Sequence, residues 1–328
     1  MPNQTTSFPS WENPMGTDGF EFIEYAAPDP VALGALFEQM GFAAVAKHRS
    51  KNVVLYRQGD INFIINGDPD SFAQSFAQLH GPSICAIAFR VKDAAIAYKQ
   101  AVTLGAWGMP GQAGVMEVNI PALQGIGDSL LYLVDRYGDW SIYDIDFVPL
   151  PGVAQKPSGA GLIRVDHVTH HVHRSRIQEW ADFYEHLFNF RKVLDFEDEL
   201  TGLKSRVMTS PCGKIRILLN ASSEDSSESP EDLDASRDEG ITQVALATLD
   251  IFAAVEALRR QGVEFQDTPD RYYDTMDRRL PGNSELLERL RRQRILIDAA
   301  STEDGGLGLR SLTKPVIGSL VFEIIQHQ

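Results

Sequence analysis

Two similar stretches decide how this chain folds: PSICAIAFRVKDAAIAYKQAVTLGA (82–106) and GITQVALATLDIFAAVEALRRQGVEF (240–265). Each begins as an apolar strand and continues into a helix that starts near an aspartate, Asp93 or Asp250. Each helix is followed by a glycine, Gly105 or Gly262. Aspartate favours helix N-caps and glycine favours helix ends, so both stretches predict the same strand–helix unit. Its recurrence indicates an internal duplication.

The regions around these stretches also match. An apolar strand opens each half, FEFIEYAA (20–27) and RVDHVTHHV (164–172), and an amphipathic helix follows it. Asp29 and Ser175 stand at the expected N-caps of those helices, and several short strands come next. We therefore predict an α+β fold of tandem βαβββ modules, paired into two half-barrel domains. The alternative is two unrelated α+β domains that share this rhythm by chance.

A segment rich in proline and glycine separates the halves, VPLPGVAQKPSGAGL (148–162). The length of 328 residues also suggests two domains. We expect an N-terminal domain over 1–152, without a metal site, and a C-terminal domain over 153–328 that carries one.

The composition excludes several classes of protein. A net charge of −15 opposes binding to nucleic acid. Much of the acid lies in 222–239, which we interpret as a solvated loop, with a functional acidic tether as the alternative. Cys85 and Cys212 are too few for a disulfide framework, and the chain has neither a secretory signal nor an apolar run of membrane length. We expect a soluble, cytoplasmic protein with no membrane partner.

Aligning the two halves suggests where a site lies. The N-terminal half has Phe22, Ala86 and Leu133 at three strand positions. The C-terminal half has His167, Gln243 and Glu323 there. Three polar side chains on three strands, all absent from the other half, predict a metal site of the facial type found in Fe(II) oxygenases. Taken alone, His167 is more often a satisfied core histidine, but a carboxylate buried at Glu323 needs a cation or a partner.

The chain resembles the 4-hydroxyphenylpyruvate dioxygenase family of the vicinal-oxygen-chelate (glyoxalase-like) superfamily. The resemblance rests on phrases such as NVVLYRQGDINFIIN (52–66), GPSICAIAFRVKDA (81–94), FYEHLFNFR (183–191) and FEIIQ (322–326). It covers about residue 12 to residue 326. It implies an Fe(II)-dependent oxygenase of aromatic amino acid catabolism, acting on an aromatic 2-oxo acid and O2. It also implies a homo-oligomer.

The resemblance implies metal ligands at His167, Gln243 and Glu323, with one departure. The family phrase Gly-Ile-Gln-His is GITQ here, so Gln243 replaces the second ligand histidine and Thr242 replaces its neighbour. An amide oxygen is a weaker ligand than imidazole for Fe(II), so the metal is iron by resemblance, another divalent ion, or absent. The sequence ends at FEIIQHQ, where the family continues into a helix over the site, so we expect that lid to be missing.

The resemblance also places a substrate pocket. Its implied residues are Ser205, Asn220, Thr242, Arg310, Leu312 and Phe322. Arg310 replaces a pocket glutamine and Leu312 a pocket aromatic; Arg310 is suited to pair with a substrate carboxylate, or to bridge Glu323 in place of a metal. Three functions stay open: an oxygenase, a metal-dependent enzyme with non-oxidative chemistry such as an isomerase or lyase, and a catalytically silent binding or regulatory homologue.

Overall fold

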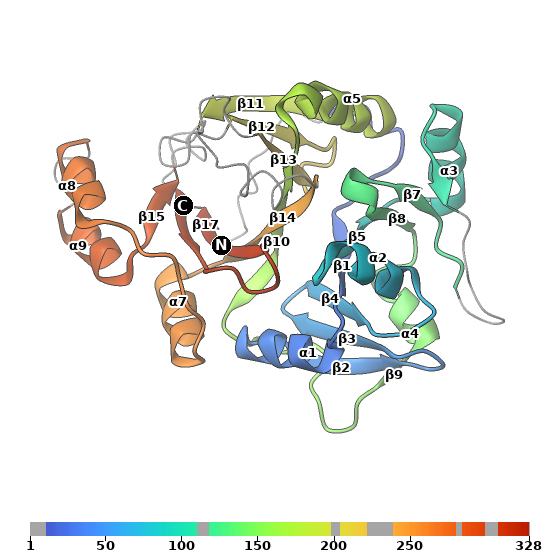
Figure 1. The fold of residues 1–328 in the computed structure, drawn as a ribbon, viewed down its shortest axis with the longest axis horizontal. Coiled ribbons are helices and arrows are strands. Elements are labelled where there is room, and N and C mark those ends of the chain that lie inside the picture. The colour runs from blue at the N-terminus through green and yellow to red at the C-terminus, as the bar shows by residue number, and fades with distance from the viewer. Residues whose placement is uncertain are drawn as a thin grey trace.

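Two curled mixed sheets lie side by side, with helices around them (Figure 1). The computed structural model describes residues 11–109, 118–197, 204–221, 239–279, 284–298 and 308–327. The predicted acidic loop lies outside these residues except for Glu239. The predicted fold class, two half-barrels of α+β type, is confirmed. Within the described part of the chain, no helix has the length and apolar character needed to cross a membrane.

The N-terminal half forms a nine-stranded sheet in the order β6-β7-β8-β5-β1-β4-β3-β2-β9. Its strands are β1 Phe20–Ala26, β2 Ala43–His48, β3 Val53–Gln58, β4 Ile61–Asn66, β5 Ser83–Arg90, β6 Gly108–Met109, β7 Ala122–Gln124, β8 Leu130–Val134 and β9 Phe147–Pro149. Its helices are α1 Pro30–Gln39, α2 Phe72–His80, α3 Ala94–Thr103, η1 Ile126–Asp128 and α4 Ile142–Asp146. The segment predicted as a linker begins inside β9, which pairs with β2 at the sheet edge.

The C-terminal half forms an eight-stranded sheet in the order β11-β12-β13-β10-β14-β17-β16-β15. Its strands are β10 Leu162–His171, β11 Arg191–Glu197, β12 Lys204–Thr209, β13 Arg216–Ala221, β14 Gly240–Thr248, β15 Leu296–Asp298, β16 Gly308–Leu312 and β17 Val321–His327. Its helices are η2 Arg174–Arg176, α5 Ile177–Phe188, α7 Ile251–Arg260, α8 Asp270–Arg279 and α9 Ser284–Gln293. The paired helices α8 and α9 lie at the outer end of this half (Figure 1).

The two sheets share one pattern of neighbours. β1 pairs parallel with β4 and antiparallel with β5, and β10 pairs in the same way with β13 and β14. Between β1 and β5, Glu24 lies opposite Ala86. Between β10 and β14, Thr169 lies opposite Gln243 in the same register. The matching registers put Phe22 and His167 at equivalent positions, as the alignment of the halves predicted.

The predicted equivalence of Leu133 and Glu323 is wrong by one residue. Ala88 pairs with Tyr132, as Ala245 pairs with Glu323, so Tyr132 is the counterpart of Glu323. The correction matters because a shift of one residue moves a side chain to the other face of a sheet.

Three of the four predicted helix starts are correct. The side chains of Asp29, Asp93 and Asp250 accept backbone N–H groups at the starts of α1, α3 and α7. Ser175 is not an N-cap, because it lies inside the short helix η2 that precedes α5.

The main hydrophobic core spans both halves. Phe63 of β4 stacks on Phe322 of β17, with ring centroids 5.9 Å apart, and Phe89 stacks on Phe190 at 6.0 Å. A second cluster, which includes Phe22, Ile64 and Ala88, packs the N-terminal half separately. The halves are therefore joined by aromatic packing, which fixes the position of β17 and of the side chains that it carries.

Candidate metal centre

Three neighbouring strands bring His167, Gln243 and Glu323 to one face of the C-terminal sheet. His167 of β10 and Glu323 of β17 both pair with Ala245 of β14, which stands between them. Gln243 lies two residues from Ala245 on the same strand, and residues two apart share a face. Because the Ala245 side chain ends at Cβ, the longer side chains on either side meet above it.

Glu323 is the centre of this group. Nε2 of Gln243 donates to Oε2 of Glu323 over 2.5 Å, and Nε2 of His167 lies 3.3 Å from the same oxygen. Nη1 of Arg310 lies 3.9 Å from Oε1. The His167 and Glu323 side chains are only 9% and 3% exposed. One buried carboxylate thus meets an imidazole, an amide and a guanidinium group.

Asp166 holds the other nitrogen of His167. Its Oδ1 lies 3.2 Å from Nδ1 of His167. A carboxylate in this position orients a histidine ring and leaves Nε2 directed toward its own partner. The sequence analysis assigned no role to Asp166. The only signal for one was its position directly before His167.

Burial and charge oppose each other at this group. Burial alone would lower the pKa of His167, but the carboxylates of Asp166 and Glu323 outweigh it and raise the pKa to about 9. Burial would likewise raise the pKa of Glu323, but His167 and then Arg310 lower it overall. Both shifts favour the ionised forms. A cation bound at Nε2 of His167 would take the place of the proton there.

Two buried polar atoms on this face have no hydrogen-bond partner among the described residues. They are Oγ1 of Thr169 and Oδ1 of Asn220. Native proteins rarely leave buried polar atoms unpaired, so a group of them indicates a place for a ligand. Thr169 lies two residues after His167 on β10 and therefore on the same face, but no role was predicted for it.

Some of the other predicted pocket residues lie on paired strands of this sheet, whereas Thr242 and Phe322 lie elsewhere. Ser205 lies opposite Asn220, and Arg310 and Leu312 lie opposite Ile325 and Glu323, so these residues are on strands that continue the same sheet. Thr242 is skipped in the pairing of β10 with β14, where Gln243 and Ile241 face successive residues, so it is the extra residue of a bulge. Phe322 packs on Phe63 in the core between the halves.

The residues present fit a divalent metal ion, with one weakened donor. His167 offers an imidazole nitrogen and Glu323 a carboxylate. Gln243 offers an amide oxygen when its amide group is turned. Across the described ranges, no three His, Cys, Asp or Glu side chains gather as a metal site, so the amide is the third protein donor at hand. Fe(II) accepts such a donor but prefers imidazole.

Comparison with known proteins gives matches over both halves. Residues 11–148 match the family model "Hydroxyphenylpyruvate dioxygenase, HPPD, N-terminal", and residues 164–278 match "Glyoxalase/Bleomycin resistance protein/Dioxygenase superfamily". The two matches fall on either side of the duplication boundary predicted from the sequence.

Individual relatives cover nearly the whole chain. The chain is 53% identical to hemolysin VllY of Vibrio vulnificus (strain CMCP6) and 50% identical to 4-hydroxyphenylpyruvate dioxygenase of Pseudomonas aeruginosa; each match covers 96% of this chain and 90% of the relative. Among solved structures, a mutant 4-hydroxymandelate synthase from Streptomyces coelicolor is similar in fold. Its TM-score is 0.80 at 22% identity, over 96% of this chain and 94% of that one.

Proposed function

Because the chain belongs to the 4-hydroxyphenylpyruvate dioxygenase family, we propose that it is a metal-dependent oxygenase of an aromatic 2-oxo acid. The observation that carries the proposal is the meeting of His167, Gln243 and Glu323 on adjacent strands, beside buried polar atoms without partners. We propose these three side chains as the ligands of one Fe(II) ion. When bound, iron supplies the redox chemistry by which dioxygen reacts with a 2-oxo acid.

The neighbouring side chains then bind and orient the substrate. Arg310 approaches within 3.9 Å of Glu323, so its guanidinium group is placed to pair with a substrate carboxylate beside the metal. Ser205 and Asn220 offer hydrogen bonds from the neighbouring strands, and Leu312 offers apolar surface for a ring. Asp166 keeps the His167 ring oriented throughout.

A second candidate is a homologue that binds a small molecule without a metal. Gln243 donates to Glu323, and both His167 and Arg310 lie near the same carboxylate, so the buried charge has protein partners of its own. A related possibility is non-oxidative chemistry on a metal held by His167, Gln243 and Glu323, since an amide oxygen suits ions that do not activate dioxygen.

Oxygen uptake distinguishes these functions. We expect the protein with saturating Fe(II) and 4-hydroxyphenylpyruvate to consume O2, and the Glu323→Gln variant to lose that uptake. Stoichiometric metal without uptake on any aromatic 2-oxo acid would favour the non-oxidative enzyme. Failure to retain any divalent ion would favour the metal-free homologue.

Some expectations stay predictions. They are the domain boundary near residue 152, a homo-oligomeric state and a cytoplasmic location. The free thiols of Cys85 and Cys212 support the last of these.

A further inference from the structure

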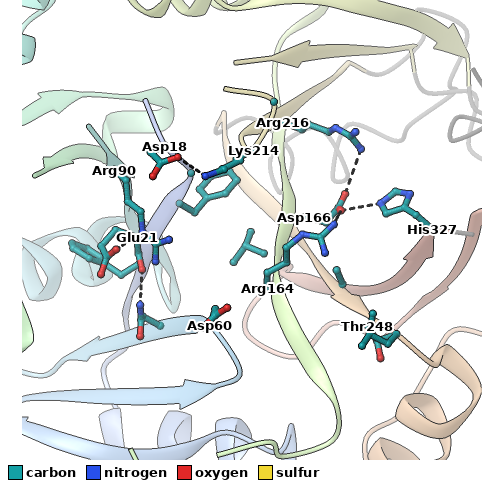
Figure 2. A pocket seen from close by; sticks show the side chains of 18 residues that line it. Asp18, Glu21, Asp60, Arg90, Arg164, Asp166, Lys214, Arg216, Thr248 and His327 are labelled. Carbon is teal, nitrogen blue, oxygen red and sulfur yellow. Dashed lines mark hydrogen bonds and ion pairs between the residues drawn. The ribbon is translucent and has the colours of Figure 1, made fainter. Parts of the chain in front are cut away.

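A cavity lies between the two halves, and one of the residues that line it is Asp166, the neighbour of His167 (Figure 2). Its volume is about 320 Å³. The N-terminal half contributes the start of β1, the turn between β3 and β4, and the end of β5. The C-terminal half contributes the start of β10, the turn between β12 and β13, and the ends of β14 and β17. Equivalent parts of the duplicated fold therefore face each other across this space.

The cavity is held by contacts between the halves. Nζ of Lys214 pairs with Oδ1 of Asp18 over 2.5 Å, and the backbone N–H of Asp60 donates to the carbonyl of Ile163 over 2.8 Å. Gly59 adopts φ +56° in this turn, and a Cβ there would lie 2.7 Å from the carbonyl oxygen of Leu162. The turn between β3 and β4 is thus seated closely on β10, so the two walls have a fixed spacing.

The two walls carry opposite charge. The C-terminal wall presents Arg164, Lys214, Arg216 and His327 around a single carboxylate, Asp166. The N-terminal wall presents Asp18, Glu21 and Asp60 with a single cation, Arg90. Lys214 is paired with Asp18, and Arg90 is paired with Glu21 over 2.5 Å.

Three other basic side chains of the C-terminal wall approach Asp166. Nε2 of His327 lies 2.9 Å and Nη2 of Arg164 lies 3.3 Å from Oδ2, and Nη1 of Arg216 lies 3.9 Å from Oδ1. The Asp166 side chain is 4% exposed, whereas those of Arg164 and Arg216 are 45% and 22% exposed. Two guanidinium groups therefore approach one buried carboxylate, and both line the cavity.

The duplication shows that the two arginines have no charged counterpart in the N-terminal half. The pairings of Ile23 with Phe63 and of Val168 with Ile217 make Asn62 the counterpart of Arg216. By the same alignment, Gly19 is the counterpart of Arg164. The chain has a net charge of −15, so its overall composition does not account for two arginines at the junction of the halves where the N-terminal half has uncharged residues.

From this geometry we propose that the cavity between the halves binds a small anion with two negative charges, a phosphate or a dicarboxylate, through Arg164 and Arg216. A guanidinium group forms bidentate hydrogen bonds with the oxygens of phosphate and of carboxylates. The exposed Asp60 at the opposite wall opposes the anion and sets how strongly it binds. This inference does not depend on the metal centre or on oxygenase activity.

Calorimetric titration of the full chain with inorganic phosphate, and separately with malonate, tests the proposal at low ionic strength. We expect one equivalent of at least one of the two to bind, and acetate to bind far more weakly. Arg216→Asn, which installs the residue of the other half, should weaken binding by about tenfold or more, and Arg164→Gln should do the same. Asp60→Asn should bind as tightly as the unaltered protein or more tightly.

Two control variants locate the site. Arg206→Asn removes an arginine that pairs with Asp195 on the surface of β12, and Arg310→Gln removes the arginine of the candidate metal centre. Neither should change the affinity, and thermal unfolding checks that each variant is folded. The proposal is overturned if neither phosphate nor malonate binds, if both Arg164→Gln and Arg216→Asn leave the affinity unchanged, or if Arg310→Gln abolishes binding.

Discussion

The two halves of this molecule have the same strand pairings but carry different side chains at three equivalent positions. At the three equivalent positions the N-terminal half has Phe22, Ala86 and Tyr132, and the C-terminal half has His167, Gln243 and Glu323. Phe22 packs in a hydrophobic cluster with Ile64 and Ala88. One scaffold therefore supports a packed core in one half and a polar centre in the other.

The polar residues that remain in the N-terminal half sharpen this contrast. Nδ2 of Asn66 donates to Oε1 of Glu24 over 2.8 Å, and burial raises the pKa of Glu24. Their counterparts Thr169 and Asn220 each have a buried oxygen without a hydrogen-bond partner among the described residues. At these two equivalent positions the halves thus differ in whether the buried polar atoms have protein partners.

The largest expected effect is on packing in the N-terminal half. Phe22 is 4% exposed, so Phe22→Ala should lower the free energy of unfolding by about 3–5 kcal/mol by leaving a cavity. Chemical denaturation measures the loss, and metal affinity of the folded variant should not change. A loss well below 1 kcal/mol would mean that this half is not the packed core described here.

The next effect is on metal affinity in the C-terminal half. Glu323→Gln removes the carboxylate ligand and should weaken binding of Mn(II) by more than about 100-fold, beyond the cost of losing an outer contact. Titration followed by electron paramagnetic resonance measures the affinity. Glu24→Gln is the matched control, because it removes a buried carboxylate from the other half. Equal losses in both variants would contradict a site confined to one half.

Restoring the replaced ligand should have a somewhat smaller effect. Gln243→His supplies an imidazole beside Glu323 and should raise Fe(II) affinity by about 10- to 100-fold. Anaerobic titration with Fe(II) measures the gain. If affinity stays the same, Gln243 does not face the metal, and the donor set proposed here is incorrect.

The effect that is smallest over a single pH unit concerns pH and stability. His170 is buried beside Tyr184, with Nε2 2.6 Å from the hydroxyl, and burial lowers its pKa from 6.5 to about 3. The unfolded chain therefore binds a proton between these values that the folded chain does not. The stability linked to neutral His170 is complete above pH 6.5 and is lost as the pH falls toward 3, by at most about 1.4 kcal/mol per pH unit.

His170→Gln keeps a polar group opposite Tyr184 and should flatten that dependence. Urea unfolding at a series of pH values below 6.5 measures the slope. Tyr25→Phe is the matched control, since Tyr25 holds the equivalent position in the N-terminal half. An unchanged slope in His170→Gln would show that this histidine is not held neutral by burial.

Sequence patterns predicted the parts of the fold that depend on local rules. The repeated strand–helix unit and the caps at Asp93 and Asp250 follow from periodicity and side-chain chemistry. The prediction at Ser175 failed because a short 3-10 helix precedes α5, and local propensity does not resolve that difference. Leu133 was matched to Glu323 because phrase similarity leaves strand register free by one residue.

The site was predictable only in part for a related reason. The alignment of the two halves singled out His167, Gln243 and Glu323, and the family resemblance suggested that Arg310 could bridge Glu323, but neither pointed to Asp166. The support from Asp166 and the approach of Arg310 depend on how β10, β16 and β17 lie in space. The cavity between the halves depends on contacts such as Lys214 with Asp18, which no local pattern encodes.

The position of a bound metal ion tests the central claim most directly. Crystals soaked with Mn(II) and measured for anomalous scattering should show one peak in contact with His167, Gln243 and Glu323, and none in the N-terminal half. A peak elsewhere, or none in this group at saturating Mn(II), would contradict the account.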